Sequence, residues 1–314
     1  MCGALACVCA VFMATAHADE QSIPRIGVMA PLVAYEQGLR EGLVKLGYVE
    51  GKNIAIDWRR AGGLVDEERS LALDLLHSSP AVIVAFGTPT ARAALEVAAV
   101  PIVFVSSDPV GSGLVTSLAR PGGNATGVSS TGPDLVAKRL QLLRQLAPRA
   151  RRIGCLVNTS NPVGSLQWEQ AKKTARALHV ELLELDAHDG AEMEAALHAL
   201  ARSTLDGLLV LGDNLFLANR GKIARAVRTA KLPAMTPVRE FMGEGILASY
   251  GPSMKEAGRM TAVYVYKILT GSKPGDLPIE EISKLDFIID LRVARELGIK
   301  VPQDLLYRAD EVIR

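Results

Sequence analysis

The stretch VIVAFGTPTARAALEVAAVPIVFVSSD, residues 82–108, contains two short apolar runs separated by a segment of helical character. The runs Val82–Phe86 and Ile102–Val105 are rich in Val, Ile and Phe, as is typical of strands buried on both faces. Thr90–Val97 lies between them and suits a helix that crosses from one parallel strand to the next. The stretch therefore predicts a strand–helix–strand unit of a parallel sheet.

The same alternation continues on both sides of this unit. Further strands are expected at Ile26–Ala30, Ile54–Trp58, Ile153–Val157, Glu181–Leu185, Leu208–Leu211, Ala234–Thr236, Ile246–Tyr250 and Phe287–Ile289. Helices are expected at Glu36–Leu46, Glu67–Leu76, Asp134–Leu146, Leu166–Leu178, Ala191–Arg202, Phe216–Ala230, Met254–Leu269 and Leu291–Leu297. This order predicts an α/β protein in which helices cover both faces of parallel sheets.

A segment rich in Gly and Pro, residues 119–127, divides the alternation into two series of ordinary domain size. We therefore expect two lobes, each a parallel sheet flanked by helices. The elements after residue 250 would have no sheet to join if the lobes were sequential. The chain is thus expected to recross, with crossovers near 125–129, 248–251 and 277–281. The predicted lobes are 24–126 plus 250–275, and 127–249 plus 276–314.

The first residues, MCGALACVCAVFMATAHADE, have the apolar run and the small residues Ala16 and Ala18 of an export signal. We expect a signal peptide over residues 1–18 and a periplasmic mature chain, although no Lys or Arg precedes Arg25. A buried first element is the alternative. A lipid-anchored form is a second alternative, but Ala4–Cys7 matches a lipobox poorly. Cleavage would leave Cys155 as the one remaining cysteine, which is expected to pack as a small apolar residue.

Charge and motifs narrow the class of function. Lys and Arg total 35 against 34 Asp and Glu, and no basic cluster is interleaved with aromatics, which argues against nucleic acid as a partner. No later apolar run is long enough for membrane insertion of the mature chain. Motifs of metalloproteases, serine hydrolases, P-loops and dinucleotide sites are missing, and the five histidines lack metal-ligand spacing. The sequence predicts no catalytic residue, no metal and no cofactor.

Ligands of open parallel sheets bind beyond the carboxyl ends of the strands, so two facing sheets predict a binding cleft between the lobes. In the first lobe the candidates for ligand binding are Met29, Pro31, Tyr35, Gly87, Thr88, Ser107 and Asp108. The hydroxyls of Thr88 and Ser107, with the amides near Asp108, are expected to hold an acidic group. Simple helix capping is the other interpretation of Thr88 and Asp108.

The second lobe and a crossover supply the remaining candidates, which are Asn158, Thr159, Asn161, Asp213, Pro237 and Tyr250. Asp213 is preferred over Asp186 for pairing with a ligand amine, with helix capping again the alternative. Tyr35 and Phe216 are candidates for stacking on an aromatic ligand, or else core residues.

Several strings carry a resemblance to a known family. They are Gly38–Glu41, Leu46–Asn53 (LGYVEGKN), Phe104–Gly127 (FVSSDPVGSGLVTSLARPGGNATG), Leu247–Pro252, Leu297–Pro302 and Leu305–Ile313. In these strings, from about Arg25 to the C-terminus, the chain resembles the ABC-transporter substrate-binding proteins whose better-known members bind tryptophan and other aromatic amino acids. The loop between Pro31 and Gly38 is shorter than is usual in that family, which affects the expected ligand.

The resemblance implies the periplasmic-binding protein type I fold, with two Rossmann-like lobes joined by three crossovers. It also implies no catalysis, and a membrane permease and ATPase as partners. We expect a monomer that captures a small carboxylate-bearing ligand, such as an amino acid or an aromatic acid. The alternatives are a ligand sensor for a membrane receptor and an α/β hydrolytic enzyme, which would use Asp108 or Asp213 as its reactive group.

Overall fold

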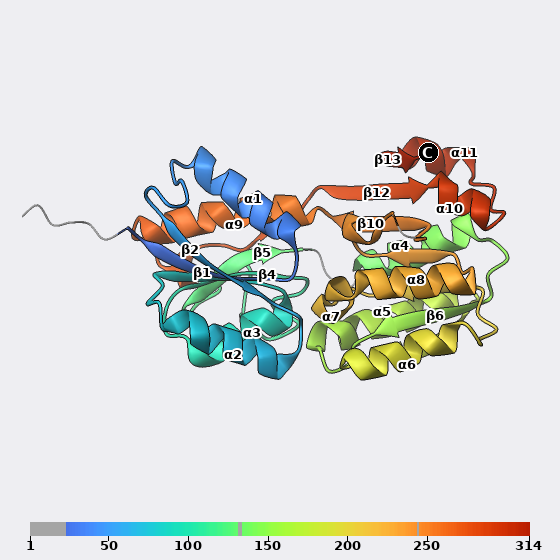
Figure 1. The fold of residues 1–314 in the computed structure, drawn as a ribbon, viewed down its shortest axis with the longest axis horizontal. Helices are drawn as coiled ribbons and strands as arrows, with labels where there is room; N and C mark the ends of the chain where they lie inside the picture. The colour runs from blue at the N-terminus through green and yellow to red at the C-terminus, as the bar shows by residue number, and fades with distance from the viewer. Residues whose placement is uncertain (1–22, 131–133, 244) are drawn as a thin grey trace, which may run out of the picture.

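The computed structural model describes residues 23–130, 134–243 and 245–314, and they form two lobes side by side (Figure 1). Each lobe has its own sheet, with the strand orders β11-β5-β4-β3-β1-β2 and β13-β12-β10-β9-β8-β6-β7. The expected signal peptide, residues 1–18, lies outside the described residues. In the described part of the chain no helix is both long and apolar enough to cross a membrane.

The first lobe is built on a fully parallel six-stranded sheet. Its strands are β1 (Arg25–Ala30), β2 (Ala55–Arg60), β3 (Val82–Phe86), β4 (Ile102–Ser106), β5 (Ala125–Ser129) and β11 (Glu280–Glu281). Helices α2 (Val65–Leu76) and α3 (Thr88–Val97) cover one face, and α1 (Val33–Lys45) and α9 (Met254–Leu269) cover the other (Figure 1). The central strands β3 and β4 are wholly buried, which explains their unbroken apolar sequence.

The second lobe is built on a seven-stranded sheet. Its strands are β6 (Arg152–Val157), β7 (Glu181–Asp186), β8 (Gly207–Val210), β9 (Ala234–Thr236), β10 (Ala248–Pro252), β12 (Leu285–Asp290) and β13 (Glu311–Ile313). Helices α4 (Asp134–Leu146) and α5 (Pro162–Ala177) pack together on one face, with α10 (Leu291–Glu296) and α11 (Gln303–Arg308) beside them. The other face carries α6 (Gly190–Leu200), α7 (Asn214–Ala218) and α8 (Arg220–Ala230). Cys155 lies in the core of this lobe, as expected.

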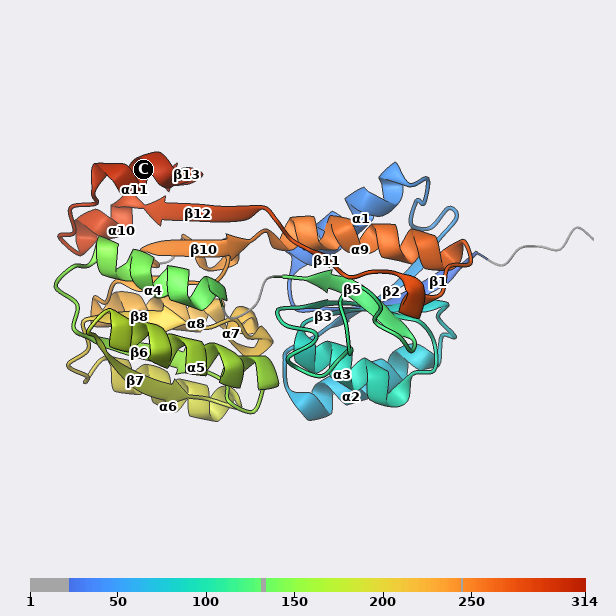
Figure 2. The same ribbon diagram turned by 180° about the vertical axis from the view of Figure 1, so that it is seen from behind.

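The chain crosses between the lobes three times, after β5, after β10 and after β11 (Figure 2). The strands place these crossings a few residues from the expected lobe boundaries. Residues 125–129 and 280–281 belong to the first sheet, while 248–252 belong to the second. The expected boundaries 126/127 and 249/250 thus fall inside β5 and β10, and the boundary 275/276 falls a few residues before β11.

Three features differ from the sequence-based expectation. The second sheet is not purely parallel, because β12 runs antiparallel to β10. The helix expected over 216–230 is two helices, α7 and α8, which meet at Asn219. The elements α11 and β13 were not expected, since each is only six or three residues long and has no clear period.

Helices α1 and α9 approach each other very closely. A Cβ atom at Gly38 would lie 1.9 Å from the carbonyl oxygen of Lys255, and one at Gly258 would lie 2.3 Å from that of Tyr35. The two glycines thus let the backbones of the helices touch. Because α9 directly follows the crossover from β10, this contact fixes how that crossover meets the first lobe.

Candidate functional site

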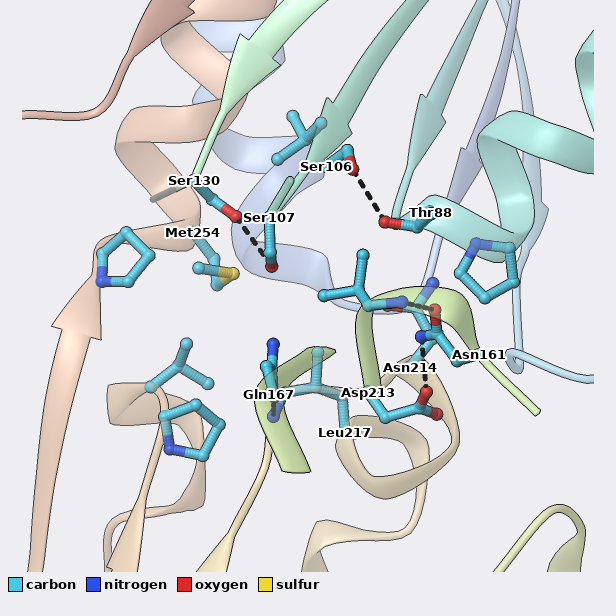
Figure 3. A pocket seen from close by; sticks show the side chains of 18 of the residues that line it. Thr88, Ser106, Ser107, Ser130, Asn161, Gln167, Asp213, Asn214, Leu217 and Met254 are labelled. Carbon is cyan, nitrogen blue, oxygen red and sulfur yellow. Dashed lines mark hydrogen bonds between the residues drawn. The ribbon is translucent and has the colours of Figure 1, made fainter. Parts of the chain in front are cut away.

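A cavity lies between the two lobes, at the carboxyl ends of strands from both sheets (Figure 3). Its volume is about 70 Å³, well below the roughly 300–1,000 Å³ of common small-molecule sites, so the lobes must separate to admit a ligand. The lining residues are Tyr35, Gly87, Thr88, Pro89, Val105, Ser106, Ser107, Ser130, Arg139, Asn161, Val163, Gln167, Gly212, Asp213, Asn214, Leu217, Pro237, Val238, Pro252 and Met254.

The first lobe lines the cavity with hydroxyl groups. Thr88 Oγ1 and Ser106 Oγ are 2.8 Å apart, and Ser107 Oγ and Ser130 Oγ are 3.3 Å apart (Figure 3). They come from the ends of β3, β4 and β5, which are neighbours in the sheet and so bring their following residues together. Hydroxyls can donate or accept, so this wall suits an oxygen-bearing ligand group.

The second lobe contributes a buried carboxylate. Asp213 is 5% exposed, and its Oδ2 accepts a 2.8 Å hydrogen bond from Asn161 Nδ2 while its Oδ1 accepts a 2.8 Å bond from Leu215 N. Burial raises the pKa of Asp213 and outweighs the hydrogen bonds from Asn161, Leu215 and Asn158, which act to lower it. A cationic group of a ligand would relieve this cost. Asp213 caps α7, as the capping interpretation expects, and it also lines the cavity.

Apolar side chains complete the walls. Val163, Leu217 and Met254 line the cavity, and Tyr35 stacks on Phe86 with ring centroids 4.2 Å apart. On the polar side, Gln167 Oε1 accepts a 3.0 Å hydrogen bond from Gly212 N. A ligand with both polar and apolar parts fits this mixture.

Seven of the thirteen candidate residues meet at the cavity. They are Tyr35, Gly87, Thr88, Ser107, Asn161, Asp213 and Pro237. Thr88 does not cap helix α3, because the N-cap residue of α3 is Gly87 and no side chain forms a capping hydrogen bond there.

Six candidates lie elsewhere, each for a local reason. Met29 belongs to β1 and is fully buried in the core, and Pro31 borders a separate groove with Arg60 and Glu240. Asp108 Oδ1 accepts from Gly111 N in its own turn. Asn158, Thr159 and Tyr250 are also absent from the lining. Of the two interpretations of Phe216, stacking on a ligand or a place in the core, the structure shows the core.

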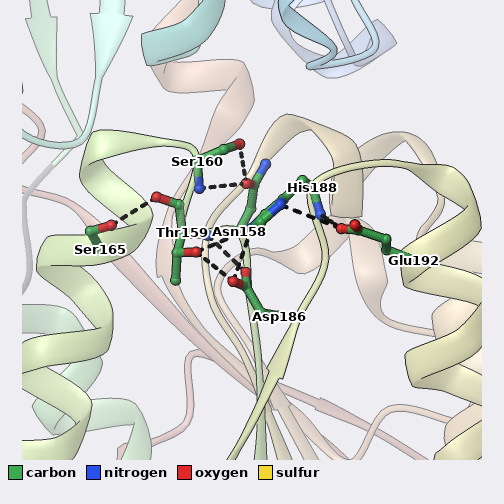
Figure 4. A network of polar contacts seen from close by, with 7 residues as sticks. All are labelled: Asn158, Thr159, Ser160, Ser165, Asp186, His188 and Glu192. Atoms are coloured by element: carbon green, nitrogen blue, oxygen red, sulfur yellow. Dashed lines mark hydrogen bonds and ion pairs between the residues drawn. The ribbon is translucent and has the colours of Figure 1, made fainter.

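Asn158 and Thr159 serve the loops that follow β6 and β7 instead (Figure 4). Asn158 Oδ1 accepts from Ser160 N at 3.1 Å, and Thr159 N donates to Asp186 Oδ1 at 2.9 Å. His188 Nε2 lies 2.9 Å from Asp186 Oδ2. Burial raises the pKa of Asp186, but the hydrogen bonds from Thr159 and His188 outweigh it and leave that pKa lowered. The network holds two loops together and engages Thr159 and the Oδ1 atom of Asn158, while the Asn158 side chain also hydrogen-bonds Asp213.

Sequence reasoning missed Ser106, Ser130, Arg139, Gln167, Asn214 and Met254. Arg139 gave a signal, because it falls on the apolar stripe of α4 formed by Val136, Leu140 and Leu143. A charge on such a stripe needs a buried polar partner. For the other five residues, the sequence offers no indication of a role in the cavity beyond their positions near strand ends or helix starts.

Asn214 joins the two lobes directly. It follows β8 of the second lobe, and its Nδ2 donates to Phe86 O at 2.8 Å and to Thr90 Oγ1 at 3.2 Å in the first lobe. The start of α7 fits against two glycines of the first lobe. A Cβ atom at Gly63 would lie 2.6 Å from Leu215 N, and one at Gly87 would lie 2.2 Å from Asn214 Nδ2. We call this contact the Asn214 latch.

Replacing Asn214 with alanine is expected to open the ligand-free protein. Two hydrogen bonds at about 1 kcal/mol each amount to about 2 kcal/mol, or a roughly 30-fold shift toward open lobes. Small-angle X-ray scattering should record a larger radius of gyration. The matched control is Asn219→Ala, which removes a hydrogen bond to Leu215 O within the second lobe. Equal scattering curves for Asn214→Ala and the unmodified chain would contradict the latch.

Three relatives show what this chain is similar to. A tyrosine-binding protein of Clostridioides difficile (strain R20291) is 28% identical over 267 residues, which are 84% of this chain and 76% of the relative. The structure of an ABC domain of Streptococcus pneumoniae in complex with L-Trp is 25% identical, with a TM-score of 0.85 over 93% of this chain and all of the other. The ligand-free, open structure of a substrate-binding protein from Clostridium difficile is 27% identical, with a TM-score of 0.64 over 93% and 99% of the two chains.

The two structural matches differ in similarity although their identities are nearly equal. The higher score belongs to the L-Trp complex, so the lobes here are arranged more like that complex than like the open form. This agrees with the latch between the lobes and confirms the expected type I periplasmic-binding fold.

The family model that matches this chain covers residues 29–313, nearly the whole described structure, and it describes binding proteins rather than enzymes. The strings quoted from the sequence fall in or beside this range. The chain belongs to the ABC transporter substrate binding protein family.

Proposed function

We propose that this protein is the periplasmic substrate-binding component of an ABC importer, and that it captures an aromatic amino acid in the interlobe cavity. The cavity carries this proposal, because it combines hydroxyls of one lobe with the Asp213 carboxylate of the other and with apolar walls. An α-amino acid offers a carboxylate, an ammonium and a side chain, which match those three surfaces in kind. The ligands of the relatives, tyrosine and L-Trp, support the aromatic side chain.

Capture proceeds by closure of the lobes about the three crossovers. In this proposal Thr88 and Ser107 meet the ligand from the first lobe, while Asn161 and Asp213 meet it from the second. The closed form then docks on a permease and its ATPase. A monomer suffices for this cycle, because both walls of the cavity come from one chain.

Titration calorimetry of residues 19–314 tests the proposal, with L-tyrosine, L-tryptophan, L-phenylalanine, L-leucine, a sugar and a nucleoside as probes. We expect binding of at least one aromatic amino acid with one site per chain, recovery of the ligand unchanged, and a raised melting temperature. Failure of every amino acid to bind would refute the proposed ligand class. Chemical conversion of a bound probe would refute the binding role itself.

A further inference from the structure

Among the residues that the structure describes, Arg139 is the one buried cation in the cavity wall. It lies on α4 and is 4% exposed, on the helix face that also buries Val136, Leu140 and Leu143. Taking a guanidinium out of water costs several kcal/mol unless it is paired. Its presence on an apolar helix face therefore needs a reason.

The protein satisfies this charge only in part. Arg139 Nε donates to Tyr250 O at 2.7 Å, and Nη2 is 3.5 Å from Pro237 O. Both acceptors are backbone carbonyls, which carry no net charge. Across the residues that the structure describes, no carboxylate forms an ion pair with Arg139 and no acceptor bonds its Nη1. Burial lowers the pKa of Arg139 to about 10, so it remains a cation at neutral pH.

The cavity wall therefore contains a guanidinium and a carboxyl group that do not pair with each other. Asp213 bonds Asn161 and Leu215, whereas Arg139 bonds two carbonyls. Both come from the second lobe and both line the cavity. A zwitterion placed between them would supply an anion to one and a cation to the other.

We infer that Arg139 is the carboxylate anchor of the cleft: its guanidinium binds the carboxylate of the ligand, and Asp213 faces the ammonium. This rests on the proposed function and deepens it, because it names the residue that recognises the carboxylate of the ligand. Arg–carboxylate pairs are strong and can form two parallel hydrogen bonds, which selects a planar anion by shape as well as by charge. The second lobe then holds the ligand by both of its charges, and the hydroxyls of the first lobe meet it on closure.

The test compares L-tryptophan with tryptamine, which keeps the ammonium and the indole but lacks the carboxylate, and L-tyrosine with tyramine. Calorimetry would measure all four on the unmodified chain and on Arg139→Met, Arg139→Lys and Lys138→Met. Lys138 precedes Arg139 on α4 and does not line the cavity, so it controls for loss of one positive charge. Comparing two ligands on one variant cancels any general change in folding or closure.

We expect the unmodified chain to prefer the amino acid over the amine by about 100-fold, and Arg139→Met to lose most of that preference. Arg139→Lys should keep part of it, because it keeps the charge but not the planar fork. Lys138→Met should keep all of it. An unchanged preference in Arg139→Met, or an equal loss for acid and amine, would overturn the inference and leave the proposed function standing. An unmodified chain that binds no amino acid would overturn both.

Discussion

Gly87→Ala is expected to weaken ligand binding by about 100-fold. Gly87 lies at the cavity, with φ of +112°, and a Cβ atom there would lie 2.2 Å from Asn214 Nδ2. The added methyl would push the second lobe away and break the Asn214 latch. A clash of this kind costs about 1–3 kcal/mol and the lost hydrogen bonds about 1 kcal/mol each, so a total near 3 kcal/mol corresponds to roughly 100-fold. Calorimetry with the amino acid that binds the unmodified chain would measure it.

Two further variants separate closure from local effects. Gly63→Ala adds a Cβ atom 2.6 Å from Leu215 N, at a residue outside the cavity, and should weaken binding in the same direction. Gly113→Ala is the control, because Gly113 has φ of +72° and no atom within 4 Å of the added Cβ. The Gly113→Ala variant has the backbone strain of a non-glycine residue at positive φ, but its added methyl group makes no contact with the other lobe. If Gly87→Ala and Gly113→Ala bound equally well, closure against α7 would not govern affinity.

Gly38→Ala is expected to lower the free energy of unfolding by about 3 kcal/mol, the upper end of the usual cost of overpacking. The added Cβ would lie 1.9 Å from the carbonyl oxygen of Lys255, and a backbone atom on a packed helix cannot move aside alone. Alanine favours the helical state by about 1 kcal/mol over glycine, so propensity alone predicts the opposite sign. Urea denaturation followed by circular dichroism would record the midpoint.

The control for this prediction is Gly190→Ala. Gly190 begins α6, and a Cβ atom there meets nothing within 4 Å. This variant should be as stable as the unmodified chain or slightly more stable. A Gly38→Ala midpoint at or above that of Gly190→Ala would show that α1 and α9 can separate without cost, contrary to the close packing of their backbones.

The binding predictions act through different parts of one cycle. Asn214→Ala and Gly87→Ala change the balance between open and closed lobes, and should affect every ligand alike. Arg139→Met changes the recognition of one chemical group, and should affect only ligands that carry a carboxylate. Comparison of the two patterns on the same set of ligands would separate closure from selectivity.

The order of residues alone indicates the α/β class, the two lobes and the recrossing of the chain. Buried parallel strands such as β3 need unbroken apolar runs, and the helices between them need a different period, so both leave a direct record in the residue order. The elements after residue 250 indicated the crossovers, because sequential lobes would leave these elements without a sheet to join. Strand-end position also brought seven of the thirteen candidates to the cavity, including Thr88 and Asp213.

Which polar side chains at the strand ends face the cleft depends on the packing of the folded chain. Thr159 and Asp186 lie at the ends of neighbouring strands, as Thr88 and Ser106 do. The first pair nevertheless joins two loops by hydrogen bonds, whereas the second pair lines the cavity. A hydrogen bond depends on the distance between donor and acceptor within a few tenths of an ångström and on the angle between them. The order of residues does not record either quantity. The close approach at Gly38 and the latch at Asn214 join residues far apart in the chain. The sequence shows Arg139 as a charged residue on an apolar helix stripe. Whether its guanidinium can bind a ligand depends on the groups around it, and these come together only when the chain folds.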